Sequence, residues 1–355
     1  MKKELLLATT IAGVALGATS ASAVTSTISG NHRVGLLDVD KDSSNATTAT
    51  TNSDIKSSFS VSLEETLDSG TKIAGAFSLM SEGGVFNYTG ASGLTLTFTD
   101  GSSLELVSAG DAHKDHDVAV PGASGEMSIA TTSSMSAKGG IDGVGGSNAV
   151  GLAWHSAADV AGVDGLSVSL SYSNGDETTI SGATVNLDSS LSAGLTYVST
   201  QGDTTITIGA GIHEASDDND TTITDTSVYH IGAVAVNGDL TVGAGVGAGD
   251  YGHDKADDHQ EVVDWQATEL GVSYVSGDFT LTASFMDAES TDAASGTAPS
   301  GSADELTKTA ASVDYAVASG VTTTLGILNQ TSKDEGTKMD TGSGTSWYIG
   351  TNLSF

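Results

Sequence analysis

Apolar residues alternate with polar or small residues along most of the chain, in segments that begin or end at a glycine turn. They occupy every second position of 206–212, which follows Gly202, and of 279–285, which follows Gly277. A period of two predicts β-strands with one apolar face. Glycine beside Asp or Asn supplies the positive φ that a tight hairpin turn requires. The pattern therefore predicts a series of β-hairpins.

Seven short turns of this kind divide the chain, and each joins two strands of about nine to twelve residues, the length of a tilted transmembrane strand. Fourteen strands plus one at each end give about 16. The turns lie at Gly70, Gly101, Gly162 to Gly165, Gly202, Gly238, Gly277 and Gly320. The last four are separated by 36, 39 and 43 residues, a period close to that of a β-propeller blade. A blade needs four short strands in each period, whereas here each period holds two longer ones, so a barrel is favoured.

Longer polar segments alternate with the short turns. We expect these loops on the opposite side of the barrel, at 38–55, 80–91, 110–148, 173–188, 214–227, 248–263, 287–307 and 331–344. Short turns on one side and long loops on the other are typical of outer-membrane proteins. The predicted fold is an all-β transmembrane antiparallel β-barrel of about 16 strands, with short periplasmic turns and long extracellular loops. A barrel of this size encloses an aqueous channel.

The two ends of the chain support export to the outer membrane. Residues 1–23 have the features of a signal peptide: Lys2 and Lys3, an apolar stretch, and the small-residue cleavage site Ala21-Ser22-Ala23. The barrel domain is then 24–355. Apolar or large side chains alternate over the last nine residues, which end in Phe355. A strand of this kind with a terminal aromatic resembles the signal that outer-membrane assembly recognises.

Composition narrows the function. The net charge of −33 excludes nucleic acid as a partner, because nothing in the chain could neutralise phosphates. The absence of cysteine excludes disulfides and thiol chemistry. No nucleophile stands in a recognisable catalytic context, so we expect no enzyme activity. The mean hydropathy of −0.01 fits strands that expose apolar residues at alternate positions, although it fits a soluble protein too.

The opening segment Ile28-Ser29-Gly30-Asn31-His32-Arg33-Val34-Gly35, together with the terminal Phe355, resembles the ends of general trimeric porins of the Gram-negative outer membrane, of the alphaproteobacterial type. The resemblance implies a homotrimer in contact with lipid and lipopolysaccharide. It also implies a water-filled pore in each subunit for ions and small hydrophilic solutes. In such porins a long third loop folds inward to form the constriction.

The longest predicted loop, 110–148, is the third. The resemblance makes its acidic residues candidates for the pore constriction: Asp111, Asp115, Asp117, Glu126 and Asp142. Strand alternation predicts the charged residues that line the pore wall: Arg33, Glu64, Lys72, Glu105, Glu269, Lys308 and Asp314. Arg33 is the only arginine in the chain, so the basic cluster expected in the family is thin. We therefore predict a preference for cations.

Three motifs have other interpretations. Asp38, Asp40 and Asp42 resemble the start of a calcium loop but lack its later glycine and carboxylate, which excludes an EF-hand. No cofactor is expected, although acidic loops could hold Ca²⁺ or Mg²⁺ loosely. The His and Asp residues of 111–117 have the chemistry of zinc ligands, and Gly247-x-Gly249-x-x-Gly252 matches a dinucleotide fingerprint only by letter, since it ends a strand. An alternative function is surface adhesion or divalent-cation binding through the acidic loops.

Overall fold

The computed structural model describes residues 24–43, 46–82, 85–91, 93–106, 112–122, 150–180, 183–216, 226–250, 262–292, 303–333 and 342–355. The predicted signal peptide lies outside these residues. The strands are β1 (Thr25–Ser43), β2 (Ala46–Thr66), β3 (Lys72–Glu82), β4 (Val85–Ala91), β5 (Leu94–Thr97), β6 (Ser103–Leu106), β7 (Val150–His155), β8 (Leu166–Ile180), β9 (Ala183–Gln201), β10 (Thr204–Ser216), β11 (Thr226–Asn237), β12 (Leu240–Asp250), β13 (Val262–Ser276), β14 (Phe279–Asp292), β15 (Ala303–Ala318), β16 (Val321–Lys333) and β17 (Gly342–Ser354). Two 3-10 turns, η1 (Lys114–His116) and η3 (Val160–Gly162), complete the described elements.

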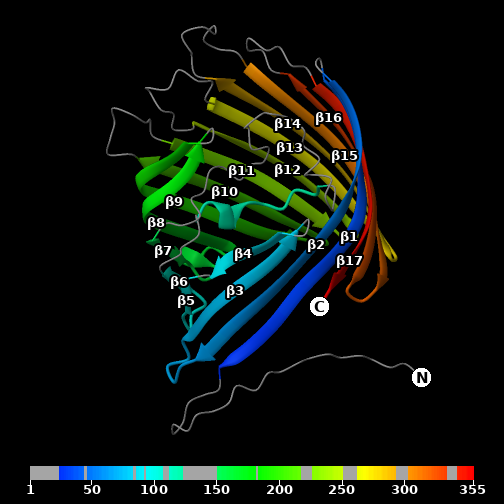
Figure 1. Ribbon diagram of the computed structural model, residues 1–355. Helices are drawn as coiled ribbons and strands as arrows, with labels where there is room; N and C mark the ends of the chain where they lie inside the picture. The colour runs from blue at the N-terminus through cyan, green and yellow to red at the C-terminus, as the bar shows by residue number, and fades with distance from the viewer. Residues whose placement is uncertain are drawn as a thin grey trace, which may run out of the picture.

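The strands form one closed antiparallel sheet (Figure 1). Neighbours in sequence pair with each other, and β1 closes the ring by pairing with β17 on one side and β2 on the other. Strands β4 and β5 both pair with β3, β4 with its second half and β5 with its first three residues. They therefore occupy one position in the ring, and the barrel has 16 strands. This confirms the predicted fold class and strand number.

Each predicted short turn contains a glycine with positive φ. The values lie between 55° and 89° at Gly70, Gly101, Gly162, Gly165, Gly202, Gly238, Gly277 and Gly320. The turn between β7 and β8 is longer than the others and contains η3. There Asp159 and Ala161 also have positive φ, at 65° and 57°. The Asp159 carboxylate accepts a hydrogen bond from the backbone N–H of Gly165 at 2.6 Å, which stabilises this turn.

Strands continue into most of the predicted long loops, and three of these predicted loops are almost wholly strand. Strands β1 and β2 pair up to Ser43 and Ala46, β3 and β4 pair up to Glu82 and Val85, and β8 and β9 pair up to Ile180 and Ala183. At 19 and 21 residues, β1 and β2 are about twice the roughly 9–11 residues that a tilted transmembrane strand requires. Beyond the lipid both faces of a strand meet water, so alternation is no longer required and the pattern does not reveal the strand. The Thr-rich composition of 46–51 still favours extended backbone.

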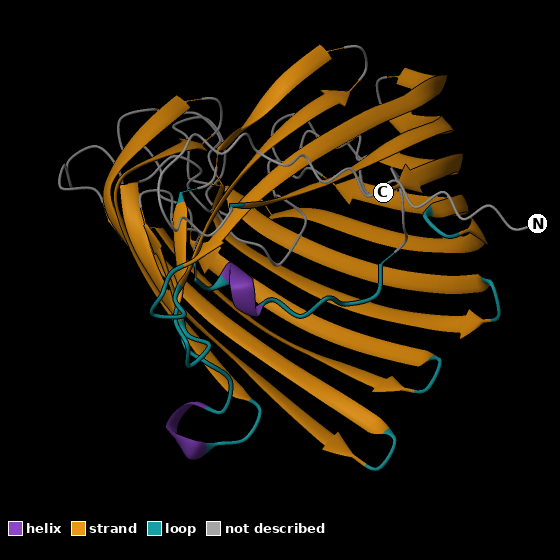
Figure 2. Cartoon of the chain, turned by 90° about the horizontal axis from the view of Figure 1, so that it is seen from below, coloured by secondary structure: helices purple, strands orange, loops and turns teal. Residues whose placement is uncertain are grey.

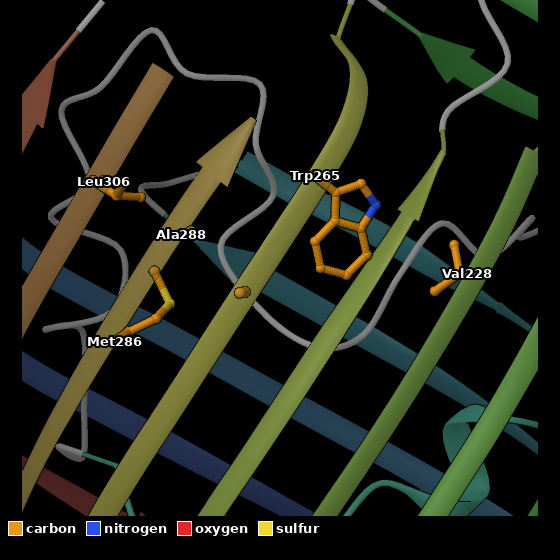
Figure 3. Packing of buried hydrophobic residues seen from close by; sticks show 6 residues of the cluster. Val228, Trp265, Met286, Ala288 and Leu306 are labelled. Atoms are coloured by element: carbon orange, nitrogen blue, oxygen red, sulfur yellow. The ribbon is translucent and has the colours of Figure 1, made fainter. Parts of the chain in front are cut away.

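The two faces of the wall differ in side-chain type. Outward positions carry large apolar residues that are about half exposed, such as Leu170, Leu191 and Ile231, and they alternate with buried positions. The inner face is mostly polar or glycine. It has two small apolar clusters, one of Ala310, Leu328 and Tyr348, and one of Val228, Trp265, Ala267, Met286, Ala288 and Leu306 (Figure 3). Among the residues described, no helix has the length and apolar character needed to cross a membrane.

Candidate functional site

A segment of the third loop, residues 112–122, lies inside the barrel. It contains η1 and then runs as extended chain along the inner surface, where Figure 2 shows it within the ring of strands. It lies across strands β8 to β13, since it contacts residues from Ser171 on β8 to Gly271 on β13. The segment therefore narrows the channel from one side.

Glycines on the inner wall form the seat of this segment. A Cβ added at Gly211 would lie 2.6 Å from the Cβ of His113, and one at Gly243 would lie 2.9 Å from the Cδ of Pro121. At Gly271 it would overlap the Pro121 carbonyl. The other seat glycines are Gly194, Gly209 and Gly232, against His116 and Val118. Real Cβ atoms do not approach so closely, so the segment can lie this near the wall only because these positions lack side chains.

Hydroxyl groups of the wall hold the segment by hydrogen bonds. The Ser171 hydroxyl accepts from the backbone N–H of Ala112 at 3.0 Å, and the Ser192 hydroxyl accepts from that of His113 at 2.7 Å. The two ring nitrogens of His116 lie 2.7 Å from the Thr196 hydroxyl and 2.8 Å from the Ser169 hydroxyl. These contacts satisfy polar groups that are buried between segment and wall, which is where a missing partner is most costly.

Three wall histidines complete the contact. His230 Nε2 donates to the His113 carbonyl oxygen at 2.9 Å, and its Nδ1 lies 2.9 Å from the Asp117 carboxylate. The His155 Nδ1 lies 3.5 Å from the Asp115 carboxylate. The ring of His213 lies 5.0 Å from that of His113, measured between centroids. Burial, followed by the charges of His213, Lys114 and His230, lowers the pKa of His113 to about 3. Burial also lowers the pKa of His116. The His113 ring is therefore neutral at pH 7.

The opposite side of the barrel carries most of the basic groups that the described strands present inward. Arg33 and Lys56 are register partners on β1 and β2, and Arg33 forms an ion pair of 2.7 Å with Asp54. Lys72 on β3 binds Glu64 at 3.0 Å. In a ring of 16 strands β2 stands eight positions from β11, so this group faces the docked segment across the lumen. The channel thus has a wall with Arg and Lys opposite a segment with Asp115 and Asp117.

A family model of Gram-negative porins matches residues 6–335. The chain belongs to this family. Outer-membrane location follows from this membership, and porins of this fold are generally channels and not enzymes.

Solved porins share the fold at low sequence identity. OmpT of Vibrio cholerae in a trimer form has 14% identity and a TM-score of 0.61, over 94% of this chain and 100% of that chain. The anion-selective porin from Comamonas acidovorans has 11% identity and a TM-score of 0.61, over 93% and 100%. A mutant of Rh. blastica porin has 17% identity and a TM-score of 0.53, over 93% and 100%. No curated protein matches the chain in sequence.

The structure places the predicted wall residues of this porin in separate groups. Arg33, Glu64 and Lys72 lie together on β1 to β3. Glu105 on β6 lies 3.8 Å from the His155 ring, close to the docked segment. The other three lie elsewhere: Lys308 on β15 interacts electrostatically with Glu269 on β13, and Asp314 accepts a hydrogen bond from Thr324. These side chains point inward, because the pairing of the strands places them on the same face as the glycines of the seat.

The predicted constriction residues of the porin are only partly described. Asp115 and Asp117 lie on the docked segment, the half-exposed Asp115 beside His155 and Asp117 against His230. Asp111, Glu126 and Asp142 lie outside the described residues, as does most of 110–148. Their role in the constriction stays a prediction.

Sequence reasoning missed several residues at this site. Lys56 and Asp54 lie two and four positions before Ser58, the inward neighbour of Phe59, so the alternation of β2 could have assigned them to the lumen. The glycines at alternate positions of β12, from Gly243 to Gly249, could have indicated a bare inner wall. The roles of His213 and His230 had no signal in the sequence, because they depend on where the third loop docks.

The metal and nucleotide motifs do not form sites in the described part of the porin. Asp38, Asp40 and Asp42 lie in strand β1 and not in a loop; an extended strand separates its residues and cannot wrap them around an ion. Asp38 instead accepts a hydrogen bond from Thr51 at 2.5 Å. Gly247 and Gly249 lie within strand β12. In the described ranges no group of three or more His, Asp or Glu side chains could hold a metal ion, those of 112–117 included.

Proposed function

We propose that this porin is a passive diffusion channel for ions and small hydrophilic solutes. The observation that carries the proposal is the seating of 112–122 against one side of the inner wall, opposite Arg33, Lys56 and Lys72. A segment held against the wall narrows the channel from one side and does not itself cross the lumen. No catalytic or cofactor chemistry is needed for this function.

The proposed channel prefers cations. Acidic side chains face the lumen on both sides of the barrel, and the whole chain has a net charge of −33. Asp54 and Glu64 pair with Arg33 and Lys72, which reduces the field of the basic group. Glu105 and Asp115 add negative charge near the docked segment. A lumen with excess negative charge raises the local concentration of cations. The anion selectivity of the Comamonas porin shows that the fold alone does not decide the sign.

Planar bilayers test both parts of the proposal. Purified, refolded protein should give stepwise ohmic conductance, and a KCl gradient should give a reversal potential of the sign expected for cation selectivity. Folded protein that gives no conductance would exclude the channel. Conductance with an anion-selective reversal potential would keep the channel and exclude the predicted preference.

We also infer a homotrimer. OmpT of Vibrio cholerae has the same fold and was solved in a trimer form. A polar contact on the outer face of β1 and β2 indicates that protein, and not lipid, covers this part of the barrel. The ring of His32 on β1 binds the Ser57 hydroxyl on β2 at 2.8 Å, on the outward side. Gly30 and Val34 flank His32 on that same face. Polar groups in contact with lipid chains lack partners, whereas a neighbouring subunit could supply them.

Cross-linking of intact outer membranes tests the assembly. A trimer that dissociates on heating is expected, and Ser57→Arg should weaken it, because a charge would be buried in the interface without a partner. Leu191→Arg, on the outward face of β9, should leave the trimer intact. A monomer in the wild type would contradict the inference.

The remaining outer surface fits lipid. Two adjoining apolar grooves of about 740 and 610 Å³ lie in the barrel wall over β10 to β17, between side chains such as Leu270, Phe285 and Leu325. Acyl chains of membrane lipid or lipopolysaccharide would fill such grooves. Adhesion or loose Ca²⁺ and Mg²⁺ binding through the acidic loops stays a prediction, and no contact in the described residues favours it over the channel.

A further inference from the structure

Five of the eight histidines of the chain gather where the docked segment meets the wall. His113 and His116 belong to the segment, and His155, His213 and His230 belong to β7, β10 and β11. His113 is fully buried, and His116, His213 and His230 are each 4% exposed or less. A barrel does not require buried imidazoles to form, since strands β1 to β6 close their part of the ring and carry no buried histidine.

The rings are close enough for their charges to interact. The centroid of His113 lies 5.0 Å from that of His213 and 5.9 Å from that of His230. His116 and His155 share one hydroxyl, that of Ser169, at 2.8 and 2.9 Å. Protonation of several of these rings would bring like charges together in a buried site, where their repulsion is strong.

We propose that this histidine cluster is a pH-sensitive latch: acidification releases segment 112–122 from the glycine seat, and the released segment obstructs the channel. The proposal rests on the proposed channel function and adds its regulation. The docked segment already lies against the wall, so any displacement moves it towards the axis of the lumen. Release therefore lowers conductance.

The groups around each segment histidine favour its neutral form. His113 faces the Ser192 hydroxyl, His213 of β10 and His230 of β11, with Lys114 and Asp117 beside it on the segment. His116 faces the hydroxyls of Thr196 and Ser169, with His155, His230 and Asp117 nearby. The carboxylates in the cluster lie against wall histidines: Asp117 at His230, and Asp115 and Glu105 at His155. They therefore offer little compensation for a charge on His113 or His116.

The sign of the pH dependence follows from the pKa values. The docked state lowers the pKa of His113 to about 3 and also lowers that of His116, whereas a released histidine has its ordinary pKa near 6.5. Above about pH 6.5 these rings are neutral in both the docked and the released segment, so the free energy of docking is at its most favourable. Below it the released His113 takes up a proton that the docked ring does not, so docking weakens about tenfold per pH unit at this residue, down to about pH 3, and the lowered pKa of His116 acts in the same direction.

A disulfide that locks the segment tests the latch directly. The chain has no cysteine, so V118C and G232C would supply its only thiols. A Cβ at position 232 meets the segment at a γ-carbon of Val118, the position that the sulfur of V118C takes, so the clash expected with valine becomes the disulfide contact. Wild-type conductance should fall severalfold between pH 7.5 and 4.5. The oxidised double variant should keep its pH 7.5 conductance at pH 4.5, and reduction should restore the fall.

The latch is excluded if the conductance of the oxidised double variant falls with pH as that of the wild type does. Protonation of lumen carboxylates would then cause the change. A wild type whose conductance is constant over this range also excludes the latch. The channel proposal fails separately, by absence of conductance at pH 7.5.

If the double variant does not fold, variants of a single histidine test the latch instead. His113→Gln retains the backbone contacts of the segment but cannot be protonated, so the midpoint of the conductance fall should move to lower pH. Tyr172→Phe, at an exposed outward position of β8 that is not part of the cluster, is the control and should titrate as the wild type does. Equal midpoints in both variants and the wild type would overturn the assignment to His113.

Discussion

The hydroxyl of Tyr348 donates a hydrogen bond to the Oδ2 oxygen of Asp54 at 2.9 Å, although 294 positions separate the two residues. Tyr348 lies on β17 and Asp54 on β2, and the Tyr ring crosses β1 between them. A Cβ at Gly35 of β1 would lie 2.7 Å from this ring, so the crossing requires glycine there. Because Asp54 also binds Arg33, the first, second and last strands are joined by side chains at the seam where the barrel closes.

Tyr348→Phe should destabilise the barrel by about 1–3 kcal/mol, because it removes a buried hydrogen bond to a carboxylate. Heat modifiability on a gel measures this: the folded band should disappear at a lower temperature than in the wild type. Tyr172→Phe, at an outward position that is 50% exposed, is the control and should unfold with the wild type. Equal transitions for Tyr348→Phe and the wild type would show that the seam contributes nothing to stability.

Gly271→Ala should push the docked segment away from the wall, because the new Cβ would overlap the Pro121 carbonyl. Overpacking of this kind costs about 1–3 kcal/mol, and displacement towards the axis should lower single-channel conductance. Gly75→Ala, whose nearest neighbour is at 3.8 Å, should conduct normally. The same conductance in both variants would mean that the segment yields without entering the lumen.

Ser192→Ala should loosen the segment without changing the barrel. It leaves the backbone N–H of His113 buried without an acceptor, at a cost of about 1–3 kcal/mol. Hydrogen exchange at the His113 amide should then be about ten- to a hundredfold faster. Ser62→Ala, on β2 on the opposite wall, is the comparison and should leave this amide protected. If exchange of the His113 amide is unchanged after Ser192→Ala, contacts other than this hydrogen bond hold the segment.

Lys56→Gln should increase cation preference, because it removes a positive charge from the wall opposite the docked segment. A unit charge roughly 10 Å from the permeating ion contributes about 0.4 kcal/mol in water, or about a factor of two in the permeability ratio. The reversal potential in a low-salt KCl gradient measures the ratio, since salt screens the effect. Lys333→Gln, at the end of β16 beside Glu305, should have a smaller effect. An equal or opposite shift would contradict the placement of Lys56 in the pore.

The features that could be predicted from the sequence are those that depend on residues close together in the chain. The turn at Gly277 and the alternation of 279–285 involve residues within a few positions, and lipid on one side of the wall enforces the alternation. The number of strands and the closure into a barrel could therefore be inferred, and the inward set from Arg33 to Asp314 could be predicted. The strand extensions at 38–43 and 46–53 could not, because no lipid enforces alternation there.

The tertiary structure alone decided which inward residues meet. Tyr348 and Asp54 become neighbours only when the ring closes, and His113 meets His213 and His230 only because a loop folds back into the barrel. Neither event leaves a periodic signal, since each depends on contacts between distant parts of the chain. The sequence by itself determined a barrel and the face of each strand, through hairpin turns and lipid contact. The seat of the loop, and the histidines that surround it, were decided by packing across the lumen.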